Sequence, residues 1–89
     1  MTRKQLAELR KRLEWNPAQM ADALGIPGPQ YNDIESGKAE LSRLHELAIE
    51  RVALSEAAAR DNYLIAFPRL RAEARILART VEGFIAAQA

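Results

Sequence analysis

Glycine and proline are concentrated in one short stretch of this chain, and this limits its possible folds more than any other feature. Three of the four glycines and three of the four prolines lie between residues 17 and 37: Gly25, Gly28, Gly37, Pro17, Pro27 and Pro29. Both residue types interrupt regular structure. The rest of the chain is rich in Ala, Leu, Arg and Glu, which favour helices, and shows no alternating strand pattern. The sequence therefore predicts an all-α fold of about five helices, short ones first and long ones later.

The first two helices have clear start signals. One helix is expected over about residues 3–14, with Thr2 as its N-cap. The next begins at Pro17, because Asn16 is a favoured N-cap and proline is favoured at the first helical position. It ends at Gly25, which adopts the positive φ of a helix C-terminus without steric cost.

Two further helices are expected before residue 60. The third starts at Pro29 with Gly28 as its cap, since a residue that precedes proline is displaced from the helical conformation. It ends at Gly37. The fourth runs over residues 42–59, and its periodicity predicts the following buried set: Leu44, Leu47, Ala48 and Val52.

The remainder, residues 61–89, is expected to be an amphipathic helix that follows a domain of residues 1–60. Its apolar residues are spaced alternately by four and three, which is a heptad-type seam: Tyr63, Phe67, Leu70, Ala74, Leu77, Val81 and Phe84. Pro68 must lie in a first turn or produce a kink. The seam either folds back on the first and fourth helices or mediates self-association or docking of a partner. The candidate self-association or partner residues are Phe67, Leu70, Leu77, Val81 and Phe84.

The second and third helices form a helix-turn-helix pattern. The positions that should face the core are apolar: Met20, Leu24, Ile26, Tyr31 and Ile34. Ala21 is small where the two helices approach, and Gly25 lies where the chain reverses. The sequence resembles the Cro/C1 phage-repressor (XRE) family in the segment QMADALGIPGPQYNDIESGK, and its first helix is similar in LAELRKRLEW. The likeness covers roughly residues 3–54.

This resemblance implies a bacterial or phage regulator of transcription that binds double-stranded operator DNA as a dimer. The start of the third helix would then enter the major groove, where Gln30 and Asn32 carry groups suited to reading base edges. The flanking residues that would contact the DNA backbone are Ser36, Lys38 and Arg43. The family also implies a structural ion pair between Arg10 and Glu35.

Charge leaves a second hypothesis open. The net charge is +1, and residues 1–41 hold six basic and six acidic side chains. Phosphate neutralisation supplies much of the affinity for DNA. Gly28, Pro29 and Asp33 offer little for base recognition. The alternative is a helix-turn-helix protein that regulates transcription by binding another regulator, as an antiactivator or antirepressor.

Other function classes are not expected. The chain has no cysteine and one histidine, so neither a thiolate nucleophile nor a zinc site can be assembled, and no enzyme, metal or cofactor is implied. No apolar run is long enough for a membrane span, and the N-terminus lacks the apolar core of a secretory signal. A cytoplasmic bacterial protein is the expectation.

Overall fold

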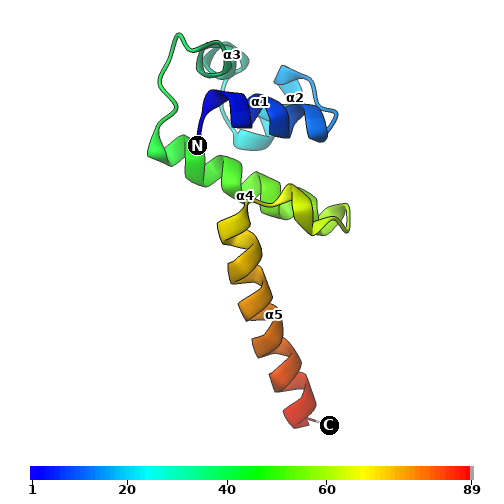
Figure 1. The fold of residues 1–89 in the computed structure, drawn as a ribbon. Coiled ribbons are helices and arrows are strands. Elements are labelled where there is room, and N and C mark those ends of the chain that lie inside the picture. The colour runs from blue at the N-terminus through cyan, green and yellow to red at the C-terminus, as the bar shows by residue number, and fades with distance from the viewer. Residues whose placement is uncertain (89) are drawn as a thin grey trace.

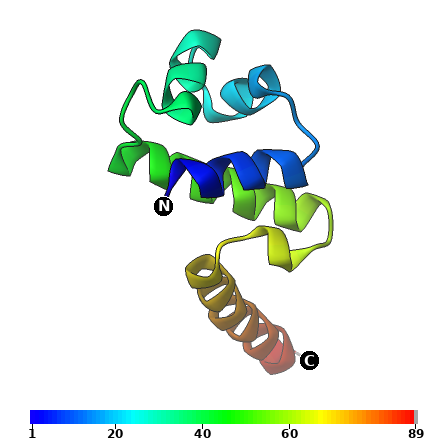
Figure 2. The same cartoon turned by 45° about the horizontal axis from the view of Figure 1, so that its top comes forward.

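The computed structural model describes residues 1–88, and within them the chain is all-helical (Figure 1). The elements are α1 (Arg3–Arg12), α2 (Pro17–Leu24), α3 (Gly28–Ser36), α4 (Arg43–Ala59), a 3₁₀ turn η1 (Tyr63–Ile65) and α5 (Pro68–Gln88). Helices α1 to α3 lie on one side of α4, and α5 leaves from the other side (Figures 1 and 2). The predicted fold class is confirmed. No helix among the described residues is long and apolar enough to cross a membrane.

The caps of α1 and α2 form as predicted. The Thr2 side chain accepts a hydrogen bond from the Gln5 N–H, and the Asn16 side chain accepts one from the Gln19 N–H. In each pair the glutamine side chain in turn accepts a hydrogen bond from the backbone N–H of the N-cap residue. Gly25 ends α2 with φ +73°. The first helix is shorter than predicted, because the chain has left helical geometry at Glu14, where φ is +60°.

Helix α3 starts one residue earlier than the sequence predicts. Gly28 is its first residue and the extended Pro27 is the N-cap, rather than Gly28 capping a helix that begins at Pro29. The steric clash of a residue with a following proline involves its Cβ, which Gly28 lacks. Glycine therefore enters the first turn where another residue would be excluded, and Pro29 is tolerated there because that turn needs no N–H.

The prediction of the buried face of α4 is wrong. The residues buried there are Ile49, Ala53 and Ala57, spaced by four, whereas Leu44 is 76% exposed and Leu47 45% exposed. Ala48 and Val52 are only half-buried. Because α4 is apolar on much of its circumference, periodicity alone did not identify the face that contacts the core. The face that packs carries small alanines, which allow the helices on both sides to approach closely.

The chain between α4 and α5 is not a continuous helix. Asp61 has φ +53°, Asn62 caps η1, and the buried Ile65 and Ala66 pack on the core before the chain turns into α5 at Pro68. The prediction of helix from Asp61 onward is therefore wrong. The seam is broken as well, because Tyr63 and Phe67 precede α5, and Phe67 packs against the core.

Helix α5 does not fold back onto α1 and α4. It has no buried residue, and the molecule measures 54 × 23 × 19 Å along its principal axes. An ion pair between Arg69 Nη2 and Glu50 Oε2, 2.7 Å apart, joins its first turn to α4. Beyond this attachment the apolar face of α5 is exposed to solvent.

Candidate nucleic-acid interface

Helix α3 has one buried face and one free face. Tyr31 and Ile34 are buried in the core, whereas Gln30, Asn32 and Asp33 are exposed. Helix α3 lies at the end of the molecule opposite α5 (Figures 1 and 2). Helix α3 therefore presents two amides and one carboxylate on a surface that no other helix of the described chain covers.

Arg10 of α1 holds the end of α3 in place. Its guanidinium donates to both carboxylate oxygens of Glu35, with Nη2–Oε1 at 2.7 Å and Nε–Oε2 at 3.0 Å. Arg10 Nη1 also donates to the Trp15 carbonyl at 3.0 Å. Hydrogen bonding from Arg10 lowers the pKa of Glu35 below its ordinary value. The pair is mostly buried, with 16% and 19% of the two side chains exposed, so it joins α1, the α1–α2 turn and α3.

The Tyr31 hydroxyl is buried beside this pair. It has no hydrogen-bond partner of good geometry among residues 1–88. Burial raises the pKa of Tyr31 well above its ordinary value, so the side chain stays neutral. Its ring is fully buried and fixes the direction of the free face of α3.

The predicted backbone-contacting residues flank the C-terminal end of α3. Lys38 is exposed in the loop after α3, and Arg43 is exposed in the first turn of α4. Arg43 Nη1 lies 3.4 Å from Glu46 Oε2, which neutralises part of its charge. Ser36 Oγ donates to the Asp33 carbonyl at 3.3 Å. The structure thus places Ser36 at the end of α3, Lys38 in the loop between α3 and α4, and Arg43 where that loop ends.

Two residues at this end of the molecule were not selected from the sequence. Arg3 Nη1 donates to the Ser36 carbonyl at 2.6 Å, which brings a basic side chain across Gly37. His45 accepts the Ser42 N–H in the α4 capping box, and its Nε2 lies 3.5 Å from Gln30 Nε2. Nothing in the sequence pointed to Arg3, because its contact with the Ser36 carbonyl, beside Gly37, exists only in the folded chain. For His45 the sequence did contain a signal, because it lies three residues after the N-cap Ser42, at the position of the second residue of a capping box.

The start of α3 keeps unpaired donors. Pro27 provides no side-chain cap, and no other side chain of residues 1–88 caps this end. The N–H groups of Gly28 and Gln30 therefore point out of the first turn, where an anion would be favoured by the helix dipole. Pro29 removes one donor from this set.

Among residues 1–88 no group of three His, Cys, Asp or Glu side chains is placed to hold a metal ion. The exposed groups at this surface are amides, a hydroxyl, guanidinium and ammonium groups, and the carboxylates of Asp33 and Glu40. The amides and the basic groups are of the kinds that contact an anionic polymer.

A comparison with models of known protein families finds a match. A family model described as helix-turn-helix, of the Cro/C1-type XRE class, matches residues 6–50, which run from α1 into α4. No curated protein and no solved structure matches the chain at a significant level. The matched segment contains α2, α3 and both residues of the Arg10–Glu35 pair.

Proposed function

Because the chain belongs to the Cro/C1-type helix-turn-helix family of DNA-binding regulators, we propose that it regulates transcription by binding operator DNA as a homodimer. The observation that carries this proposal is the free face of α3, held by Arg10 and Glu35 and uncovered by any other helix of the described chain. A helix presented in this way fits the major groove.

Within this proposal the polar residues divide into two roles. Gln30 and Asn32 lie on the free face of α3 and read base edges, because amides form paired hydrogen bonds with adenine. Lys38, Arg43 and Ser36 lie at the far end of α3 and contact phosphates, which adds affinity without sequence preference. Contacts between the apolar faces of two α5 helices form the dimer.

Titration of duplex DNA over a range of salt concentrations tests this assignment. K38A and R43A are expected to weaken binding to all sequences alike, and each lowers the slope of log K against log salt by about one. N32A is expected to change the preferred sequence, with a loss of about 1–3 kcal/mol at the base that it contacts. R79A is the matched control, since Arg79 lies on α5 at the opposite end of the molecule.

Two outcomes would contradict the proposal. Equal effects of R79A and K38A would mean that the DNA face is elsewhere, and absence of DNA binding at low salt would exclude the DNA-binding function. A specific observation favours a second candidate in that event: Asp33 and Glu40 are exposed around α3 and offset the basic groups there. The chain would then act on another regulator, and a purified transcription factor, rather than DNA, would shift its sedimentation.

A further inference from the structure

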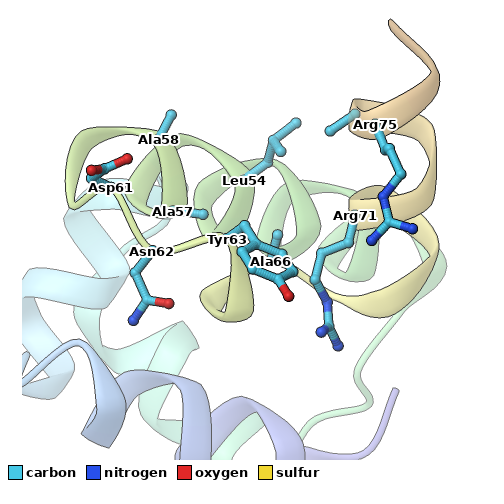
Figure 3. Close-up of a pocket in the computed structure, with 10 residues that line it drawn as sticks. Leu54, Ala57, Ala58, Asp61, Asn62, Tyr63, Ala66, Arg71 and Arg75 are labelled. Atoms are coloured by element: carbon cyan, nitrogen blue, oxygen red, sulfur yellow. The ribbon is translucent and has the colours of Figure 1, made fainter. Parts of the chain in front are cut away.

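A groove lies in the angle between the end of α4, η1 and the start of α5 (Figure 3). Its volume is about 580 Å³, within the range of ~300–1,000 Å³ that is usual for small-molecule sites. Most of the side chains that line it are apolar, and the smallest of them are Ala57, Ala58, Ala66 and Ala74. Because alanine side chains are short, these walls leave room for a ring system between α4 and α5.

Tyr63 supplies an aromatic surface inside this groove. It belongs to η1, it is 63% exposed, and its ring lies between the α4 wall and the arginines of α5 (Figure 3). Aromatic rings gain more from stacking on another ring than their buried area alone provides. An aromatic molecule therefore fits the apolar part of the groove better than an aliphatic one of the same size.

Two guanidinium groups border the groove on its α5 side. Arg71 and Arg75 are one helical turn apart and both line it (Figure 3). Neither forms an ion pair among residues 1–88, whereas Arg69, earlier in the same helix, is paired with Glu50. Arg71 Nε is also buried without a hydrogen-bond partner within residues 1–88. A buried donor without an acceptor is costly, so these groups favour an anionic acceptor in the groove.

The balance of charge in the groove selects an anion with a single charge. Asp61 is the one acidic residue among those that line it, and it lies on the side opposite the arginines (Figure 3). Arg71 also borders a smaller hollow, where Glu8 and Arg12 offset each other. The groove therefore carries one excess positive charge. A carboxylate neutralises it, whereas a doubly charged phosphate ester would leave excess negative charge near Asp61.

We propose that this groove binds a small aromatic carboxylate. The ring system lies against Tyr63 and the alanines, and the carboxylate accepts hydrogen bonds from the guanidinium groups of Arg71 and Arg75. A guanidinium and a carboxylate form paired, charge-assisted hydrogen bonds, which are stronger than those between neutral groups. The site goes beyond the DNA-binding function proposed above and does not depend on it.

A molecule bound in this groove contacts α4, η1 and α5 at once. Within the described chain an ion pair, Arg69–Glu50, joins the first turn of α5 directly to α4, and no residue of α5 is buried. The bound molecule adds contacts on a second side of the same helix. It therefore acts as an effector that holds α5 at one angle to the helix-turn-helix domain.

Titration of naphthoate into the isotope-labelled chain, without DNA, tests the site by nuclear magnetic resonance. The backbone signals of Ala57, Tyr63 and Ala74 are expected to shift together and to saturate. Naphthamide, which has nearly the same shape but no charge, is expected to bind roughly tenfold more weakly. Absence of binding, or shifts confined to the exposed apolar residues Leu77 and Phe84, would overturn the proposal. Tighter binding of naphthyl phosphate than of naphthoate would overturn the assignment of a single charge.

Charge removal tests the two arginines. R71Q and R75Q are each expected to raise the dissociation constant of naphthoate by roughly tenfold. R79Q is the matched control, because Arg79 is one turn further along α5 and does not line the groove, so little change is expected. An equal effect of R79Q and R75Q would mean that the anion is attracted by the general charge of α5, and would refute the site.

Filling the groove tests its apolar part. A74F places a large side chain in the groove and is expected to abolish naphthoate binding. Ala74 is exposed in the single chain, so the variant should keep its helical circular dichroism. A72F is the matched control, because Ala72 is also exposed on α5 but does not line the groove. Unchanged binding by A74F would mean that naphthoate binds elsewhere.

Discussion

The Arg10–Glu35 pair shows how single residues determine the position of the candidate interface. Its two-point contact, at 2.7 and 3.0 Å, connects the middle of α1 with the last turn of α3. A planar guanidinium and a carboxylate fit each other in only one orientation, so the pair fixes direction as well as distance. Its main role is therefore to set the angle of α3 rather than to contact a ligand.

Loss of the Glu35 charge is expected to destabilise the fold. In E35Q the half-buried Arg10 lacks its counter-charge, and the free energy of unfolding at pH 7 falls by about 1–3 kcal/mol. Urea denaturation measures this effect. E8Q is the control, because Glu8 is exposed on α1, the helix of Arg10, and its substitution should change the stability by less than about 0.5 kcal/mol.

The same pair predicts a specific dependence on pH. The pKa of Glu35 is lower in the folded protein than its ordinary value of 4.5, so its contribution to stability is complete above pH 4.5. This contribution is lost as the pH falls through the lowered pKa of the folded state. The stability difference between the unmodified chain and E35Q should therefore shrink below pH 4.5. A difference that grows with acidity would contradict the assigned charge state.

Gly37 occupies a position that only glycine can fill. Its φ is +87°, and the Arg3 guanidinium occupies the space that a Cβ would need. G37A is expected to cost about 1–2 kcal/mol of stability, measured by thermal unfolding. In G83A, where φ is not positive and nothing lies within 4 Å, no loss should occur. Equal stability of G37A and the unmodified chain would mean that, in solution, the Arg3 side chain does not stay beside Gly37.

At the scale of the helices, α4 is the element that organises the core. It contacts α2 and η1, and its buried residues Ile49, Ala53 and Ala57 form a line along one face. Small residues in that line permit close packing against the helices of the motif on one side and η1 on the other. The large exposed residues Leu44 and Leu47 lie outside this contact.

Two substitutions on α4 distinguish the observed face from the predicted one. I49A removes a fully buried side chain and is expected to lower the free energy of unfolding by about 2–5 kcal/mol. L44A removes an exposed side chain and should change it by less than about 0.5 kcal/mol. Chemical denaturation compares the two variants directly. A larger decrease in the free energy of unfolding for L44A would mean that the face predicted from periodicity is the buried one.

Local signals predicted the helix boundaries better than the helix faces. Asn16, Pro17 and Gly25 delimit α2 because each acts through its own backbone and the three or four residues nearest to it. The burial of Ile49 in place of Leu44 depends on which helices surround α4, and no local pattern contains that information. The break at Asp61 also escaped prediction: its φ is positive, and the buried Ile65 and Ala66 that follow it contact residues distant in the sequence.

At the scale of the whole molecule, the two exposed surfaces lie far apart. Helix α3 and the free part of α5 are at opposite ends of a particle 54 Å long (Figure 1). The Cα radius of gyration is 15.4 Å, whereas a compact chain of this length has about 12 Å. The two surfaces can therefore be occupied at the same time, as a dimeric regulator on DNA requires.

Charged residues introduced on the apolar face of α5 should abolish self-association without unfolding the chain. The double variant L77E/V81E is expected to become monomeric while keeping the unfolding temperature of the helix-turn-helix domain, because neither residue is buried in the single chain. Sedimentation velocity and circular dichroism measure the two properties. I76E is the control: Ile76 is as exposed, at 61%, but lies on the other side of the helix, so association should persist. Loss of association in I76E as well would argue against a specific seam.

The sequence by itself determined the helical class, the caps and turns, and the family, because these depend on residues close together in the chain. It also determined which residues are candidates for DNA recognition, but not their surroundings: Arg3 beside Ser36 and His45 beside Gln30 appear only in the folded chain. The tertiary structure alone decided that α5 projects and exposes its seam. No residue of α5 belongs to the core that α1 to α4 and η1 form, and burial depends on the partners available in space rather than on the spacing of apolar residues.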